Sequence, residues 1–164
     1  MLTRTITGGD VGVDIAALRA AKAVGLETGG WMARGWRTDA GTKPEYAEQY
    51  GVQQLDTPDR DARHIRNIRE SNAVLLLARS VLSSDMKSAL AAIRKPGDTR
   101  PYRIVEWGEY DIVRVLDTHR DAVVRFLLEP GRMIVSVVGG RDQFVEAPVQ
   151  AWLEQVFREV QRLQ

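Results

Sequence analysis

A glycine-rich turn near the amino terminus carries the first residues whose types could bind a ligand. Gly8-Gly9-Asp10-Val11-Gly12 stands between a short strand pattern and a helix pattern. Glycine lets the backbone approach a ligand closely, and a helix start offers N–H groups and partial positive charge to a phosphate. Asp10 and Asp14 suit hydrogen bonds to ribose or base donors instead. The alternative is a tight strand-to-helix turn with an aspartate as the helix cap.

A second segment combines glycine, aromatic rings and arginines. It contains Gly30, Trp31, Arg34, Trp36 and Arg37. A nucleotide or pterin site needs a flat stacking surface beside a forked phosphate contact, which tryptophan and arginine supply. In this hypothesis Arg37, with Arg34 as second choice, neutralises a phosphate, and one of the two tryptophans stacks on a ring. The alternative is a surface loop anchored by tryptophan, with solvated arginines.

Arginines at every third position of a predicted helix form no continuous basic stripe. Each step of three residues turns about 300°, so the row drifts around the helix, and acidic residues interrupt it. We therefore interpret this row as a solvated helix face, comprising Arg60, Arg63, Arg66 and Arg69. His64 and His119 have no nearby partner in the sequence, and we expect a surface or capping role for both.

Motifs of enzymatic chemistry are not visible in the chain. It contains no G-x-S-x-G elbow and no close pair of carboxylates at a recognisable spacing. The absence of cysteine excludes disulfides, zinc ribbons, iron–sulfur sites and cysteine nucleophiles. Two histidines nearly exclude a histidine-rich metal site. The sequence therefore identifies no catalytic residue and predicts no metal site.

The length of the chain indicates one domain over residues 1–164. The 23 basic and 22 acidic residues give a net charge of +1, which argues against a dedicated nucleic-acid binder. No apolar run is long enough to cross a membrane and the amino terminus lacks a signal-peptide core, so a cytoplasmic location is expected. A homo-oligomer stays open, because the apolar last helix suits either a core or an interface.

Alternating strand and helix patterns position these candidate residues. The apolar run 73–78 predicts a central strand covered on both faces, and weaker strand patterns fall at 3–7, 27–30, 102–107 and 133–138. Thr118 is expected to cap one helix and Pro148 to stand in the first turn of the last. Residues 31–58 are interpreted as a long polar loop, which at this length is either functional or wrongly assigned. The alternation predicts an α/β fold, a Rossmann-like three-layer α/β/α arrangement with a mostly parallel sheet.

Such a sheet also predicts where a ligand would bind. In open parallel sheets the ligand crevice lies beyond the carboxyl ends of the strands. Four segments follow predicted strands, and we expect them to meet at one site. They are residues 8–14, the loop from Gly29, residues 79–85 and residues 139–142.

Several stretches are similar to the motifs of one family. Residues 8–18 are similar to its G-G-Q-T-G-V-D-x-A-A-L motif, with Asp10 in place of the glutamine, and residues 29–37 are similar to its G-G-W-x-x-x-G-R-R. Arg63, Asn67 and Ser71 fit an R-x-x-x-N-x-x-x-S-D segment, and residues 137–141 resemble its strand and turn before the final helix. In these stretches the chain resembles the molybdenum cofactor carrier family, a branch of the SLOG superfamily of Rossmann-like nucleotide-ligand proteins.

The resemblance implies binding of a small phosphorylated, nucleotide-like ligand, with the molybdenum cofactor or a nucleotide as candidates. Where the family has a second, glycine-rich phosphate loop, this chain has Ser83, Ser84 and Asp85, of which Asp85 adds negative charge. Our leading hypothesis is a non-catalytic carrier or sensor that uses this loop together with the Gly8–Asp14 and Gly30–Arg37 segments.

Two alternatives stay open beside this hypothesis. A hydrolase or transferase of nucleoside or nucleotide N-glycosidic bonds would use a carboxylate near the same crevice. However, the catalytic glutamate of related phosphoribohydrolases, in G-G-x-G-T-x-x-E, has no counterpart after Ser84. A nucleic-acid-associated protein is the second alternative, because the superfamily includes DNA-processing members, and the near-zero net charge argues against it.

Overall fold

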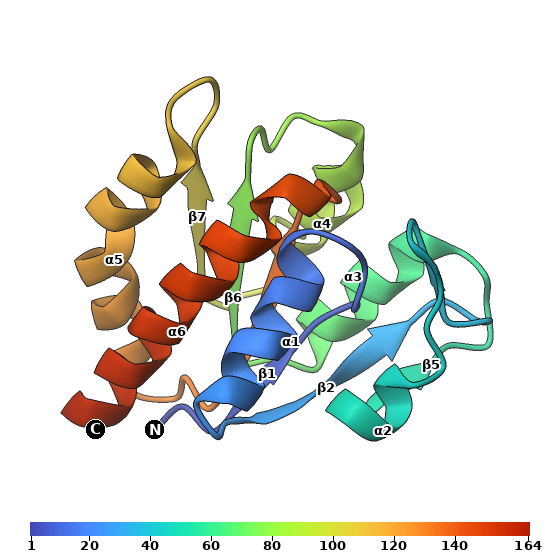
Figure 1. Cartoon of the computed structure of the whole chain (residues 1–164), viewed down its shortest axis with the longest axis horizontal. Coiled ribbons are helices and arrows are strands. Elements are labelled where there is room, and N and C mark those ends of the chain that lie inside the picture. Colours follow the sequence, from blue (N-terminus) through green and yellow to red (C-terminus); the bar gives the residue numbers. More distant parts are fainter.

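Six parallel strands form the central sheet, in the order β5-β2-β1-β8-β6-β7 (Figure 1). The structure is a computed structural model that describes residues 1–164. The strands are β1 (Arg4–Ile6), β2 (Glu27–Met32), β5 (Val52–Gln54), β6 (Ala73–Ala78), β7 (Tyr102–Glu106) and β8 (Ile134–Gly139). The parallel pairing and the helices between successive strands confirm the predicted Rossmann-like α/β fold.

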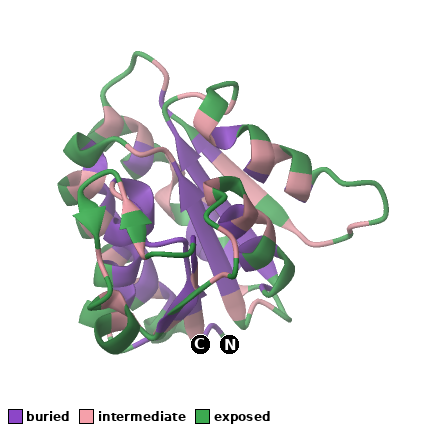
Figure 2. Ribbon diagram, turned by 90° about the vertical axis from the view of Figure 1, so that its right-hand side faces the viewer, coloured by how far each residue is buried: buried purple, intermediate pink, exposed green.

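Helices cover both faces of this sheet. One face carries α1 (Val13–Ala23), α5 (Ile112–Leu128) and α6 (Glu146–Leu163), and the other carries α3 (Arg60–Arg69) and α4 (Lys87–Ile93). Side chains of β6 alternate between the two layers: Leu75 and Leu77 join the core under α1, α5 and α6, and Val74 and Leu76 join the core under α3 and α4. Figure 2 shows the buried strands between helices whose outer faces are exposed.

The strand order places a switch point in the middle of the sheet. The chain builds β1, β2 and β5 toward one edge and then crosses to form β6 and β7 on the other side. β8 finally returns between β1 and β6. A crevice is expected beyond the carboxyl ends of strands at such a point. The segments that follow β1, β6 and β8 are therefore brought to one place.

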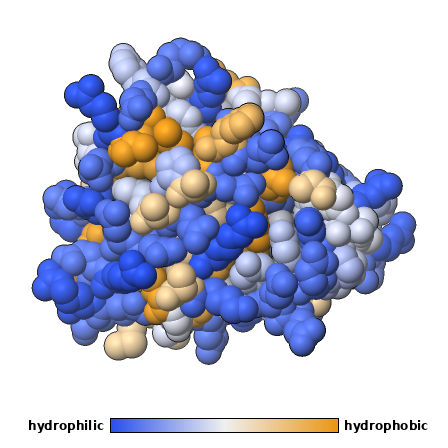
Figure 3. Space-filling model, viewed as in Figure 1, coloured by the Kyte–Doolittle hydropathy of each residue, from blue (hydrophilic) through white to orange (hydrophobic).

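The apolar stripe of α6 belongs to the core. Val149, Leu153, Val156, Phe157 and Val160 are all buried. The surface over α1, α5 and α6 is mainly hydrophilic, with separate hydrophobic areas (Figure 3). The helix begins two residues before Pro148, so the proline does lie in its first turn. None of the helices has the length and apolar character that crossing a membrane requires.

The interpretation of residues 31–58 as one long loop is wrong. This segment contains the end of β2, the hairpin strands β3 (Arg37–Thr38) and β4 (Gly41–Thr42), the helix α2 (Tyr46–Tyr50) and β5. Elements of two to five residues are too short to show a hydrophobic period. Their aromatic residues Trp36, Tyr46 and Tyr50 instead pack against a small core of Ile15, Leu18, Met32 and Val52.

The start of α5 also differs from the expectation. Thr118 lies inside the helix, where its hydroxyl donates to the carbonyl of Arg114. The residue that caps α5 is Asp111, whose carboxylate accepts a hydrogen bond from the N–H of Arg114 at 3.0 Å. The sequence of residues 111–116 suits a strand as well as a helix, and this ambiguity obscured the earlier start of α5.

Replacing Asp111 with alanine is expected to lower the free energy of unfolding by about 1 kcal/mol, because the start of α5 loses its side-chain acceptor. Urea denaturation measures this change. Asp117→Ala, on the exposed surface of the same helix, should change stability by about 0.5 kcal/mol or less. Equal effects of the two variants would contradict the capping role of Asp111.

Candidate functional site

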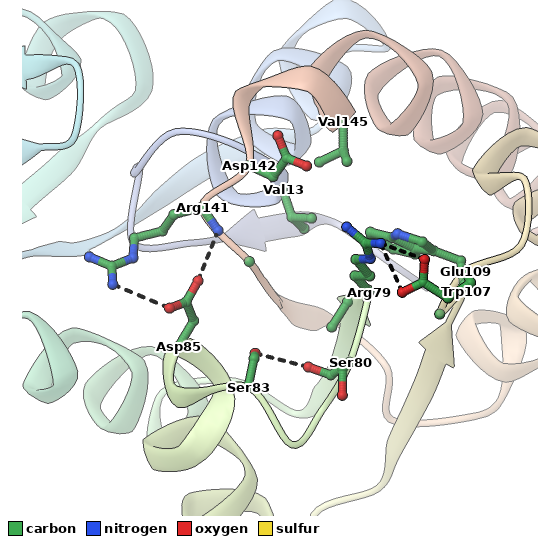
Figure 4. A pocket seen from close by; sticks show the side chains of 13 residues that line it. Val13, Arg79, Ser80, Ser83, Asp85, Trp107, Glu109, Arg141, Asp142 and Val145 are labelled. Atoms are coloured by element: carbon green, nitrogen blue, oxygen red, sulfur yellow. Dashed lines mark hydrogen bonds and ion pairs between the residues drawn. The ribbon is translucent and has the colours of Figure 1, made fainter.

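A cavity of about 350 Å³ lies beyond the carboxyl ends of β6, β7 and β8 (Figure 4). We call it the first cavity. Val13, Trp107 and Val145 are apolar parts of its wall. Arg141 and Asp85 lie on one side, and Arg79 and Glu109 lie with the Trp107 ring on the opposite side. The first cavity therefore offers an aromatic and aliphatic surface between two groups of charged side chains.

A second cavity of about 360 Å³ adjoins the first and has no hydrophobic residue in its wall. It lies at the start of α3 and is lined by Arg60, Arg63, His64 and Ser84, among others. Asp85 and Arg141 line both cavities. Their side chains approach to 3.3 Å and form the common wall. A cavity with several apolar residues in its wall and a cavity without any thus meet at one ion pair.

Asp10 holds the arginines of α3 beneath the glycine-rich turn. Its carboxylate is buried and accepts hydrogen bonds from the N–H groups of Val11 (2.8 Å) and Asp39 (3.0 Å). It forms an ion pair with Arg60 and lies 3.4 Å from Nη2 of Arg63. Asp10 therefore ties the turn after β1, the β3–β4 hairpin and α3 together.

Arg63 has more buried, unpaired side-chain donors than any other residue that lines the second cavity. Only 3% of it is exposed, and its Nε and Nη1 atoms have no hydrogen-bond partner. Burial of an unpaired donor on a charged group costs free energy unless an acceptor satisfies it. A planar guanidinium with free donors suits the oxygens of a phosphate or carboxylate. The interpretation of Arg63 as part of a solvated helix face is wrong.

Asp14 lies behind Arg63, on the far side of Gly8. A side chain at Gly8 would lie within 2.8 Å of both the Arg63 Nε and the Asp14 carboxylate, so only glycine fits between them. Both carboxylate oxygens of Asp14 lack a hydrogen-bond partner. Burial raises the pKa of Asp14 to about 7, although the positive charge of Arg63 opposes this shift. Asp14 lies outside the walls of the two cavities.

His64 is buried beside the same arginines, which contradicts the expected surface role. Only 3% of the residue is exposed. Burial lowers the pKa of its imidazole to about 3, and the positive charges of Arg63, Arg141 and Arg60 act in the same direction. His64 is therefore neutral at physiological pH, and its ring adds no charge to the second cavity.

The backbone of the Gly8–Gly12 turn is largely satisfied by the chain itself. The N–H of Gly9 donates to the Thr7 hydroxyl, and the N–H of Gly12 donates to Glu146 at 3.0 Å. A side chain at Gly12, which has a positive φ of 90°, would clash with the carbonyl of Gly140. The turn therefore packs α1 against the loop after β8, and phosphate binding by its N–H groups stays a prediction.

The predicted residues of the Gly30–Arg37 segment lie outside both cavities. Arg66 stacks on the ring of Trp31 at 4.4 Å, and the Trp31 Nε1 donates to Glu70. Arg34 bonds the carbonyl of Asp56, and Arg37 is exposed on β3. Gly30 lies against β1, where a side chain would clash with the carbonyl of Thr7. The hairpin instead contributes Asp39, which pairs with Arg60 at 2.7 Å and lies 3.6 Å from Arg141.

The loop after β6 does reach the site. Ser83 and Asp85 line the first cavity, and Ser84 and Asp85 line the second. They meet the segment 139–142 and Val13 there, so three of the four segments expected to converge do so. Trp107 carried no signal in the sequence, and His64 was expected at the surface or as a cap. Arg79 belongs to a segment that was expected to converge, but neither it nor Arg63 or Arg141 was selected as a binding residue. The signals for the last two were the R-x-x-x-N-x-x-x-S segment and the position of Arg141 directly after Gly139-Gly140.

Comparison with known proteins gives two matches for these features. A family model described as "Circularly permutated YpsA SLOG family" matches residues 5–159. A crystal structure of a "Putative molybdenum carrier protein" from Syntrophus aciditrophicus is 22% identical in sequence, with a TM-score of 0.76. That similarity covers 95% of this chain and 94% of the other, and it shows a common fold. No curated protein matches the chain.

Proposed function

Because the chain belongs to the circularly permutated YpsA SLOG family, we propose that it binds or carries a small phosphorylated, nucleotide-like ligand across its two cavities. The buried guanidinium of Arg63 is the observation that carries this proposal, since its Nε and Nη1 have no partner in the chain. The phosphate would occupy the second cavity against Arg63. The ring would occupy the first cavity against Trp107.

The site has one cavity lined by arginines and one with apolar contacts, which correspond to the phosphate and the ring of such a ligand. The second cavity is lined by no hydrophobic residue and by three arginines, Arg60, Arg63 and Arg141. Arg60 already pairs with Asp10 and Asp39, and Arg141 pairs with Asp85. Arg63 therefore keeps the most free donor capacity. The first cavity supplies apolar contacts from Val13, Val145 and the Trp107 ring, which suit a flat heterocycle.

A carrier role is favoured over a catalytic role by the placement of the two groups with strongly shifted pKa values. Asp14 has a pKa suited to acid–base catalysis, but it lies outside the walls of both cavities. His64 lines the second cavity as a neutral ring whose pKa of about 3 makes it a weak base. Neither group combines access to the cavities with a pKa near neutrality.

The molybdenum cofactor is one candidate cargo, in view of the carrier similar in fold. The chain has no cysteine, so no thiolate could hold the metal. The residues present fit the organic part of that cofactor. Arg63 would hold its phosphate and Trp107 would contact its pterin. A nucleoside monophosphate offers the same two groups, so titrations with both kinds of ligand are needed to separate them.

Substituting lysine for Arg63 is expected to weaken ligand binding about tenfold or more, because lysine keeps the charge but loses the planar fork. Isothermal titration with nucleoside monophosphates and a molybdopterin source measures the change. Arg66→Lys, one turn away on the exposed side of α3, is the matched control and should bind as the wild type does. The proposal would be contradicted if none of these ligands bound the protein, or if the two variants bound them with equal affinity.

A further inference from the structure

The carboxylate of Asp85 occupies an anion-binding position at the turn after β8. It accepts hydrogen bonds from the backbone N–H of Arg141 at 3.5 Å and from the Arg141 Nη2 at 3.3 Å (Figure 4). Gly140 lies beside the same carboxylate, because a β-carbon at this position would be 4.0 Å from Oδ2 of Asp85. A backbone N–H and a guanidinium on one glycine-containing turn are donors that a phosphate commonly uses.

The charges of the first cavity are already balanced or negative. Arg79 forms two hydrogen bonds with the carboxylate of Glu109, at 2.7 and 2.8 Å. Arg141 is paired with Asp85, and Asp142 has no cationic partner. The first cavity thus has no free cation. Arg63, which lines the second cavity, retains two buried donors without a partner. The two cavities together offer one place for an anion.

We infer that Asp85 is a specificity-determining residue that restricts the ligand to a single phosphate. This inference rests on the proposed function. One phosphate binds at Arg63, and an uncharged part of the ligand enters the first cavity. A second phosphoryl group extending toward the first cavity would meet the carboxylate of Asp85 at the donors of Arg141. Like charges at such a contact repel, and the site selects against nucleoside diphosphates, triphosphates and pyrophosphates.

The test compares inorganic phosphate with pyrophosphate, two probes that differ by one phosphoryl group. Titration followed by NMR of the 15N-labelled protein measures weak affinities and reports the Arg141 N–H directly. We expect the wild type to bind pyrophosphate no more tightly than phosphate. Asp85→Asn should raise the affinity for pyrophosphate about tenfold, since removing one charge near a phosphate has an effect of this order. It should change phosphate affinity about threefold or less.

Two further variants make this comparison decisive. Asp85→Ser removes the carboxylate with a smaller side chain, and it should act in the same direction. Asp98→Asn is the matched control, because Asp98 pairs with Arg100 at 2.9 Å and lines neither cavity. It should leave the affinities for both probes unchanged.

The outcomes separate this inference from the proposed function. Binding of phosphate to the wild type with no gain of pyrophosphate affinity in either Asp85 variant would overturn the role of Asp85 alone. A wild type that prefers pyrophosphate about tenfold would also overturn it. If wild type and variants bind neither probe, both the proposed function and this inference fail.

Discussion

Replacing Arg63 with methionine is expected to lower the free energy of unfolding by about 3 kcal/mol at pH 8, a cost typical of removing one partner from a buried charge cluster. Methionine retains the length of the side chain but not its charge. Asp14 would lose its nearest opposing charge, and Asp10 would keep only Arg60 as an ion-pair partner. Denaturation with urea at fixed pH measures the loss, together with the slope that reports a two-state transition.

The same variant should lose less stability at pH 5.5. Asp14 has a pKa of about 7 in the folded protein, so it is mostly protonated at that pH and needs the arginine less. Arg66→Met is the matched control, because its guanidinium is about half exposed and pairs with Glu70 on the surface. It should cost about 1 kcal/mol or less at either pH. An equal loss in both variants would show that the buried cluster depends little on Arg63.

The parts of the fold that could be predicted are those with a local signal. The run 73–78 is apolar throughout, because β6 is covered by helices on both faces. The apolar stripe of α6, from Val149 to Val160, repeats over about three turns, so its helical period is clear. The segments after β6 and β8 could be assigned to the site, since a parallel sheet always brings the carboxyl ends of its strands to one edge.

The burial of Arg63 and His64 could not be predicted, because its cause is distant in the sequence. On α3 the arginines look alike, and the row drifts around the helix. The partners that distinguish them are Asp10 and Asp14, which the β1–α1 turn brings beneath α3. Trp31 is misleading for a related reason. Its aromatic ring suits a ligand, but the fold places it against Arg66 and Glu70.

The buried cluster also explains why the glycine-rich turn contains aspartates where a simple phosphate loop would have none. Asp10 accepts a hydrogen bond from the N–H of Val11 and pairs with Arg60. In a simple phosphate loop, the phosphate of the ligand would make these contacts. The acidic side chain thus satisfies the turn from within the chain. Arg63 on α3, which lines the second cavity, instead keeps two donors without a partner in the chain. The site that we propose therefore lies nearer to α3 and the loop after β8 than to the turn after β1.

Asparagine at position 14 is expected to stabilise the protein by up to about 4 kcal/mol at pH 8.5, because it removes the cost of ionising a buried carboxyl. Asp14 has a pKa of about 7 when folded, against an ordinary value of 3.8 for an aspartate. Below pH 3.8 the group is protonated in both states, and stability is unaffected. Between the two values the folded state holds a proton that the unfolded state releases, so stability falls as the pH rises. Above pH 7 the loss is complete.

The measurement is the difference in unfolding free energy between Asp14→Asn and the wild type at pH 4, 5.5, 7 and 8.5. The difference should be small at pH 4, grow through pH 5.5 and level off above pH 7. The groups that face Asp14 are Arg63, which lowers its pKa, and Asp10, which raises it; the N–H groups of Gly139 and Asp10 favour the ionised form without forming full hydrogen bonds. Asp117→Asn on the exposed face of α5 controls for the loss of one negative charge. If the variant is less stable than the wild type at pH 8.5, attraction to Arg63 outweighs the cost of burying the Asp14 carboxylate. Asp14 would then be ionised in the folded protein and would pair with the guanidinium that we assign to the ligand.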